Sequence, residues 1–462
     1  MKNIKTALIT LGSVFALSAC FDGVDNDNTV ENPPTPPQAN ASVRVIHASP
    51  DAPDVNVLSS GNGIAGLNDL AYGTASGLSF FRTGPFNFTV DAQLPGGDTA
   101  TVIELPASLE DNKQYNVIAV GDTANIAPLL VVNDESEVGS GNIRAQVVHG
   151  APDAPTVDVY VTAPGTDLAS EQALATLSFQ DFTGQVEVPA GTYQIRVAVA
   201  GTTTVAFDSG PLDLAAGADL LITAIENVGP GASPINLLVA DGAGSFVVSD
   251  VNTPAEVRAI HGIADAPAVD VFADVAGDDD ILLFDGAPFK GVTLYIDVAG
   301  GDYLLDVKAD ADNSIVAIDD AAVSLMAGTR YTALANNTLA MADLDLIIDD
   351  GRPLATAAQV RIFHASQATG PVDIYVTADG NIAGMTPAFS AVPYSTGTLA
   401  ETGYVQLPAG DYFVTVTPTG TMTAAIETGM LTLEVGKIYT AIAVDGDVAG
   451  AGPQLILADD FL

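Results

Sequence analysis

Basic residues, histidine, cysteine and tryptophan are all scarce in this sequence of 462 residues. Lysine and arginine together number 14 against 57 acidic residues, so the formal net charge at pH 7 is −43. A surface this negative repels the phosphates of nucleic acids and of anionic lipids, and we expect no nucleic-acid partner. The absence of tryptophan removes the best stacking surface for a sugar ring, which leaves Tyr160, Tyr375 and Tyr394 as candidates for a carbohydrate site.

The single cysteine, Cys20, excludes an internal disulfide, a thiolate metal cluster and a redox pair. A short basic start with Lys2 and Lys5 and an apolar run over residues 7–16 precede it. That run is too short to span a membrane, and the layout is typical of a secretory signal. Residues 17–20, Leu-Ser-Ala-Cys, resemble the lipobox of bacterial lipoproteins, in which the cysteine is acylated and becomes the mature N-terminus.

We therefore predict a lipoprotein signal peptide over residues 1–20 and a lipid anchor at Cys20 that attaches the exported chain to a membrane of the bacterial cell envelope. The alternative is a chance cysteine near an ordinary cleavage site. Phe21 stands where an inner-membrane retention signal carries aspartate, which favours the outer membrane. Residues 21–42 are rich in Pro and Asp and almost free of apolar side chains, so we predict a disordered tether.

One segment recurs four times in the remainder of the chain. It reads VRVIHASPDAP from Val43, AQVVHGAPDAP from Ala145 and VRAIHGIADAP from Val257, and it opens a fourth copy, VRIFHAS, at Val360. Each copy continues into an alternating strand of the kind VDVY. Every histidine of the chain belongs to one of these segments, and they are His47, His149, His261 and His364.

Short alternating strands with Gly and Pro turns recur over roughly 100 residues in each copy, the pattern of a β-sandwich. The tyrosine that opens the penultimate strand in three copies resembles the tyrosine corner of immunoglobulin domains, whereas the second copy has Leu220 there. The expected fold class is all-β: four tandem immunoglobulin-like β-sandwich domains after a signal peptide and a disordered tether. Polar linkers separate the copies, so we expect independent units. These units, called repeats 1 to 4, span residues 43–138, 143–250, 256–353 and 359–462.

The pattern V-R-x-x-H-A/G-x-P-D-A-P-x-V-D-V-Y resembles a bacterial family of domains of unknown function, number 4397. The resemblance extends from Val43 to the end of the chain. It has departures at Asn56, at Gln146 and in the fourth copy at residues 368–370. It implies an extracytoplasmic, often repeated, β-rich domain, and it implies no activity.

The repeated histidine ends a strand, on the side of its apolar neighbours, just before a turn rich in Asp and Pro. Two roles are open for it. The ring either caps the turn through a hydrogen bond to a loop carbonyl or to Asp51, Asp153 or Asp265, or it acts as a metal ligand or a general base beside that aspartate. A transition-metal site would need carboxylates alone to complete it, and a lone turn histidine is rarely catalytic, so we expect a structural role.

Acidic clusters at turns and linkers are the candidates for a cation site, because calcium prefers oxygen ligands. The weak calcium candidates are Asp278, Asp279, Asp280, Asp349 and Asp350. Solvated charge is the plain alternative, since no cluster matches a ligand spacing with a fixed register. No other cofactor is expected.

The sequence contains no G-x-S-x-G, H-E-x-x-H or P-loop motif, and we identify no catalytic residue. We expect a non-enzymatic cell-envelope lipoprotein whose four domains bind an unknown surface polymer or protein, as in adhesion. The variable first halves of the repeats, such as residues 74–81 and 380–396, would carry the binding patch. The alternative is a structural envelope spacer, with or without calcium stiffening, and an enzyme or enzyme accessory module comes third.

Overall fold

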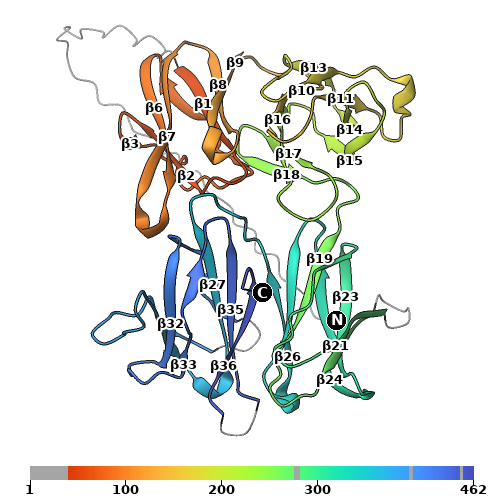
Figure 1. Cartoon of the computed structure of the whole chain (residues 1–462). Helices are drawn as coiled ribbons and strands as arrows, with labels where there is room; N and C mark the ends of the chain where they lie inside the picture. The colour runs from red at the N-terminus through yellow and green to blue at the C-terminus, as the bar shows by residue number, and fades with distance from the viewer. Residues whose placement is uncertain (1–39, 275–280, 395–398, 448–450, 462) are drawn as a thin grey trace, which may run out of the picture. The chain divides into compact units, whose positions relative to one another are not determined.

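The computed structural model describes residues 40–274, 281–394, 399–447 and 451–461 (Figure 1). Cys20, the predicted signal peptide and the first nineteen residues of the predicted tether lie outside these ranges. The calcium candidates Asp278, Asp279 and Asp280 lie outside them as well. The described residues form β-strands, turns and a few one-turn 3-10 helices. No described helix is long and apolar enough to cross a membrane.

Repeats 1 and 2 each contain two antiparallel-rich sheets. The elements of repeat 1 are β1 (Asn40–Ala48), β2 (Val55–Ser59), β3 (Asn62–Gly63), β4 (Thr74–Ala75), β5 (Ser79–Arg82), β6 (Gly84–Gln93), η1 (Pro95–Gly97), β7 (Thr99–Leu109), β8 (Lys113–Val120), η2 (Thr123–Asn125) and β9 (Ala127–Asp134). Those of repeat 2 are β10 (Asn142–His149), β11 (Val157–Thr162), η3 (Leu168–Ser170), β12 (Ala175–Leu177), β13 (Val186–Pro189), β14 (Gly191–Val199), β15 (Val205–Leu214), β16 (Asp219–Glu226), β17 (Ile235–Ala240) and β18 (Ser245–Val248).

Repeats 3 and 4 are built in the same way. Repeat 3 contains β19 (Ala255–His261), β20 (Val269–Asp274), β21 (Ile281–Ala287), β22 (Ile296–Val298), β23 (Gly301–Ala309), β24 (Asp312–Leu325), β25 (Arg330–Asn336), η4 (Leu339–Met341) and β26 (Asp343–Ile348). Repeat 4 contains β27 (Ala358–Ala365), η5 (Gln367–Thr369), β28 (Val372–Thr377), β29 (Phe389–Val392), β30 (Ala400–Glu401), β31 (Val405–Leu407), β32 (Gly410–Pro418), β33 (Ile426–Glu427), β34 (Leu431–Leu433), β35 (Ile438–Val444) and β36 (Gln454–Asp459).

The all-β, sandwich-like fold expected from the sequence is confirmed, and its strand order adds a detail. The first sheet of repeat 1 has the order β4-β1-β8-β9, and the second has β3-β2-β6-β7. In all four repeats the opening strand pairs in parallel with a strand near the end of the repeat: β1 with β8, β10 with β16, β19 with β25 and β27 with β35. An immunoglobulin constant domain keeps its first two strands in one sheet, whereas here β1 and β2 lie in different sheets.

Each repeat encloses its own apolar core between its two sheets. In repeat 1 the side chains of Val45 and Val117 from the first sheet meet those of Val57 and Val90 from the second. Corresponding clusters fill the other three repeats. The alternating residues of strands such as VDVY point inward at every second position, which is why the strand pattern was readable from the sequence.

The opening strands are buried on both faces, because the first sheets also pack against a neighbouring repeat. Ile46 and Ile118 of repeat 1 share a buried cluster with Val148, Leu221 and Leu238 of repeat 2. A matching cluster joins repeats 3 and 4 and includes Ile260, Leu334, Phe363, Ile442 and Ile456. The expectation of independent units is therefore wrong for these two pairs. Runs such as VRVIHA carry apolar side chains at consecutive positions, as strands buried on both faces do.

The tyrosine that opens the penultimate strand bonds back to the chain just before that strand. Its hydroxyl accepts the backbone N–H of the residue five positions earlier, at Tyr115, Tyr331 and Tyr439. The distances are 2.9, 3.0 and 3.1 Å. This is the hydrogen bond that defines a tyrosine corner.

Candidate functional site: the histidine-capped turn

All four histidines make the same hydrogen bond, to the carbonyl oxygen six residues later. The distances from Nε2 are 3.0 Å to Pro53, 3.1 Å to Pro155, 3.0 Å to Pro267 and 2.6 Å to Gly370. A carbonyl oxygen only accepts, so each ring carries its proton on Nε2. In His47 and His261, Nδ1 accepts the backbone N–H two residues later, at 3.3 Å. We call the segment from each histidine to this carbonyl the histidine-capped turn.

All four rings are buried, and burial keeps those of His47, His261 and His364 neutral. Burial lowers the pKa of His47 to about 4, with a smaller contribution from the positive charge of Arg352, while the Pro53 carbonyl opposes the shift. Burial also lowers the pKa of His261 and of His364. At pH 7 these rings are therefore uncharged donors to a fixed carbonyl. In this geometry Nε2 is occupied and cannot serve as a base or a metal ligand.

An aromatic ring packs edge-on against each histidine. The partners are Tyr72, Phe179, Phe289 and Tyr394, with ring centroids 6.0 to 6.4 Å from the imidazole. In the first three repeats the next residue has a positive φ and donates its N–H to the histidine carbonyl. The sequence reasoning missed these aromatics, since their distance from the histidine varies with loop length. A Tyr or Phe 25 to 30 residues after each histidine was the available signal.

The aspartate of the turn does not contact the histidine; its carboxylate or backbone bonds to the opposite loop. Asp51 Oδ1 accepts the backbone N–H of Thr123 at 2.7 Å and its hydroxyl at 2.9 Å. Asp265 Oδ1 accepts the N–H of Leu339 at 2.6 Å. In repeat 2 the backbone N–H of Asp153 donates to Glu226 Oε1 at 2.9 Å. The sequence left open whether the histidine bonds to a loop carbonyl or to the aspartate of the turn. In every repeat its partner is the carbonyl.

Reciprocal polar contacts cross the two buried interfaces between repeats. Arg258 of repeat 3 donates to Asp459 of repeat 4 at 2.6 Å, and Arg361 of repeat 4 forms an ion pair with Asp349 of repeat 3. In repeats 1 and 2 the equivalent contacts are an arginine bonded to a backbone carbonyl and a pair of side-chain amides. Arg44 donates to the carbonyl of Asp241 at 2.8 Å, and Asn133 Nδ2 donates to Gln146 Oε1 at 2.8 Å. Each pair of repeats thus packs like an isologous dimer, in which the same positions contact one another in both directions.

Asp349 is therefore a buried ion-pair partner and not an open ligand. Its side chain is 6 % exposed, and its Oδ2 also accepts the hydroxyls of Tyr295 at 2.8 Å and Thr332 at 2.5 Å. The calcium candidate Asp349 is in this sense a wrong choice, because its oxygens are already occupied. Asp350 is exposed, and in the described residues no hydrogen bond to its side chain is present.

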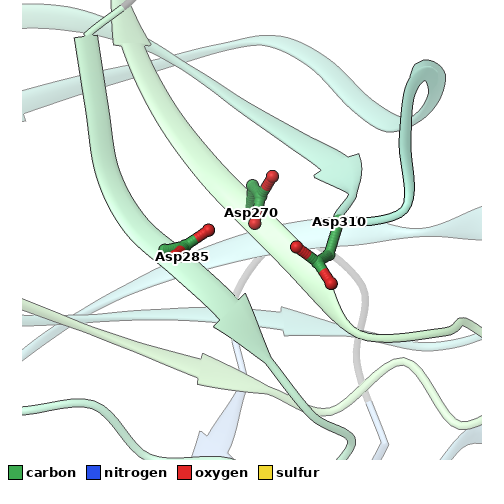
Figure 2. Close-up of side chains that lie close together, drawn as sticks. All are labelled: Asp270, Asp285 and Asp310. Atoms are coloured by element: carbon green, nitrogen blue, oxygen red, sulfur yellow. The ribbon is translucent and has the colours of Figure 1, made fainter.

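Three other carboxylates of repeat 3 do come together (Figure 2). Asp270 on β20, Asp285 on β21 and Asp310 after β23 each place an oxygen within 4.8 Å of the other two. Asp270 is buried, and its Oδ1 accepts the N–H of Gly286 at 2.8 Å. A second group, Asp306, Asp319 and Asp320, meets the same distance criterion in repeat 3. Hard divalent cations take such oxygen ligands, so both clusters are calcium candidates among the described residues.

Comparison with known proteins gives one family. The sequence pattern of the domain of unknown function DUF4397 matches residues 41–160 and 255–375, together just over half of the chain. The chain belongs to the DUF4397 family. No curated protein matches it.

Two solved structures resemble the chain only remotely. The Bacillus anthracis TIE protein is 12 % identical, and the match covers 87 % of this chain and 68 % of that one with a TM-score of 0.17. The pneumococcal glycogen-degrading virulence factor SpuA is 9 % identical over 60 % of this chain and 37 % of its own, with a TM-score of 0.15.

The two DUF4397 matches follow the pairing of the repeats. Each begins at the opening strand of an odd-numbered repeat, β1 or β19. Each ends in the second strand of the following repeat, β11 or β28. The matched segment therefore contains both histidine-capped turns of a pair.

The variable stretches expected to carry a binding patch expose few large apolar side chains. Of the three tyrosines proposed for a carbohydrate site, two are inaccessible. Phe80 is 70 % exposed within residues 74–81, and Met385 is 50 % exposed within residues 380–396, of which 395 and 396 lie outside the described chain. Tyr160 and Tyr375 are buried, and Tyr394 packs on His364. The suggestion that Tyr160 and Tyr375 form a surface for sugar rings is therefore wrong.

Proposed function

We propose that this DUF4397 protein is a non-enzymatic lipoprotein, anchored through Cys20 in the bacterial cell envelope, whose repeats bind a surface polymer or a partner protein. The outer membrane is the expected location, since Phe21 stands in place of the retention aspartate. The anchoring part of the proposal rests on the signal sequence, and the binding part rests on the histidine-capped turn.

The observation that carries the binding proposal is a rigid turn that is exposed in two copies. In repeats 2 and 3 the residues Asp153, Pro155, Asp265 and Pro267 are exposed. In each of these turns the buried histidine bonds to the proline carbonyl, and an aromatic ring packs against the histidine. Binding loops are commonly carried in this way on a rigid β-scaffold, because a preordered loop loses little entropy when it binds.

An adhesion experiment tests the binding function. The mature chain from residue 21 is immobilised, and capture of intact cells of the producing species is counted against a surface of a matched acidic protein. We expect saturable capture by the mature chain that the free chain competes away. Capture equal to that of the control surface would contradict the proposal.

A second experiment tests the anchor. Cells producing the full chain or Cys20→Ser are labelled with a palmitate analogue and fractionated. We expect label and membrane retention only with Cys20, since stable anchoring takes more than one acyl chain and no other cysteine exists. Equal retention of both proteins would contradict a lipid anchor.

A structural spacer is the second candidate, favoured by the buried clusters that join the repeats in pairs. An enzyme remains third. A cleft of about 500 Å³ lies beside the interface of repeats 3 and 4, and its lining includes Arg361, Glu401 and Tyr404 but none of the four histidines. This cleft therefore has no histidine in its lining that could act as a catalytic acid or base.

A further inference from the structure

The histidine-capped turn of repeat 1 already holds an arginine from elsewhere in the chain. Arg352, which precedes repeat 4, donates from one terminal nitrogen to the carbonyl of Pro50 and from the other to that of Ala52. The distances are 2.5 and 2.8 Å. Its guanidinium lies 5.0 Å from the ring centroid of Tyr72, the same ring that packs on His47.

The contact extends beyond the side chain of Arg352. The backbone N–H of Ala355 donates to the carbonyl of Asp51 at 2.9 Å, so three successive carbonyls of the turn receive donors from one short segment, residues 352–355. A planar guanidinium presents parallel donors that fit two neighbouring carbonyls, and its face fits an aromatic ring. The turn of repeat 1 is covered accordingly, and Ala52 is 2 % exposed.

Repeats 2 and 3 have the equivalent backbone carbonyls and an aromatic ring, but no described arginine is bound to them. Pro152 and Ala154 correspond to Pro50 and Ala52, as do Ala264 and Ala266 in repeat 3. No described residue donates a hydrogen bond to the carbonyls of these four residues. Phe179 and Phe289 stand in the place of Tyr72. Repeat 4 differs, because a 3-10 helix, η5, replaces this part of the turn.

We infer that the turns at residues 150–156 and 262–268 bind an arginine side chain of a partner protein, in the manner in which repeat 1 binds Arg352. The inference rests on the proposed binding function and names the chemistry of its ligand. The charge agrees in part: the chain carries −43, and of the two aspartates near Arg352, Asp54 and the weaker Asp51, repeats 2 and 3 keep the second. The equivalents of Asp51 are Asp153 and Asp265, whereas Thr156 and Ala268 stand in place of Asp54. A partner with a solvent-exposed Arg-Pro segment fits best, since the segment seen in repeat 1 is Arg352-Pro353.

The probe for this inference is a peptide of the sequence at residues 351–355, Gly-Arg-Pro-Leu-Ala, with a diazirine analogue in place of leucine. It is irradiated with the mature chain, and the crosslinked residues are located by mass spectrometry. We expect crosslinks in the turns of repeats 2 and 3 and, in Arg352→Ala, a third set at residues 50–54. The same peptides with citrulline or lysine in place of arginine should crosslink at least tenfold less.

Two variants with an internal control locate the site. Asp153→Asn should lower the yield several-fold in repeat 2 only, and Asp265→Asn should lower it in repeat 3 only, so that the unchanged turn reports correct folding. Asp302→Asn removes an equal charge from an exposed site on β23 and should change neither yield.

Three results would overturn the inference: equal yields with the citrulline or lysine peptide, crosslinks spread over the acidic surface, or no crosslinks in these turns. If the arginine peptide fails while the immobilised chain still captures cells, only the ligand chemistry is wrong. If the peptide crosslinks to these turns but the immobilised chain captures no cells, the proposed cell-surface binding function is wrong instead. Self-association of the chain that the peptide disrupts would replace a foreign partner by a second copy and overturn that part of the inference.

Discussion

The ion pair between Arg361 and Asp349 offers the sharpest test of how the repeats are joined. Both side chains are nearly inaccessible, at 2 % and 6 % exposure. The equivalent contact in repeats 1 and 2 is the amide pair of Gln146 and Asn133. The chain therefore contains a neutral version of its own buried ion pair, and this predicts that Arg361→Gln and Asp349→Asn are each harmful alone and compensate each other.

The expected magnitudes follow from the contacts that each change leaves behind. Arg361→Gln leaves the Asp349 carboxylate buried, with hydroxyl donors from Tyr295 and Thr332 and with Arg258 only at 3.9 Å. Asp349→Asn leaves the guanidinium with the carbonyl of Ile348. Breaking a buried pair by removing one partner costs about 3 kcal/mol or more of unfolding free energy.

The double variant loses less than the sum of these effects. It gives up the contacts of the guanidinium with the rings of Phe363 and Tyr404, at 4.7 and 4.3 Å, and its bond to Ile348. Each of these is worth roughly 1 kcal/mol, so the double variant should lose about 3 kcal/mol rather than about 6. The predicted coupling energy is then about 3 kcal/mol.

Native-state hydrogen exchange is the suitable assay, because a chain of several packed units has no single free energy of unfolding. Protection of peptides from β27 and β35 reports the interface of repeats 3 and 4, and peptides from β10 and β16 serve as the unaffected control. If the two single effects simply add in the double variant, the reasoning about compensation is refuted.

Three further predictions concern the turn, its pH dependence and cations. His149→Ala should lower the melting temperature of the mature chain, because the carbonyl of Pro155 loses its buried donor; an unchanged melt with lost cell capture would instead assign the ring to binding. The pKa of His47 is lowered to about 4 in the folded chain, so the unfolded state takes up the proton first and stability is lost as the pH falls from about 6.5 toward 4; the stability advantage of the wild type over His47→Gln should shrink over that range in parallel urea titrations, and a constant difference would contradict it. Millimolar calcium, but not magnesium, should raise the melting temperature by several degrees if Asp270, Asp285 and Asp310 hold an ion, and Asp310→Asn should abolish the rise; an equal shift with either ion would mean screened charge.

Local sequence patterns predicted most of the individual strands, but the pairing of strands that are distant in sequence could not be predicted. The alternation in VDVY and the tyrosine before the penultimate strand are short-range signals, and the structure has the corresponding strand and hydrogen bond. The parallel pairing of β1 with β8 joins residues about 70 positions apart, and nothing in either strand specifies its partner. One sequence signal did indicate that the repeats pack in pairs: the segment VRVIHA has apolar side chains on both faces of its strand. The prediction of independent units did not take this signal into account.

In the candidate site, too, the local contacts could be predicted from the sequence and the long-range contacts could not. A hydrogen bond from histidine to a loop carbonyl follows from a ring placed at the end of a strand beside a turn, and it was among the expected roles. Asp349 was a calcium candidate together with Asp350, because only the fold brings Arg361 to it from the next repeat. The contacts of Arg352 could not be predicted for the same reason, since its partners Pro50 and Ala52 lie three hundred residues away in sequence.

The central claim is that the exposed turns bind a component of the cell surface, and one binding isotherm tests it most directly. Labelled mature chain is titrated onto purified envelopes of the producing species, wild type beside a variant that combines Asp153→Asn with Asp265→Asn. The account predicts saturable binding that the double variant weakens at least tenfold at unchanged melting temperature. Binding that never saturates, or that is identical for the two proteins, would contradict it and leave the spacer as the better description.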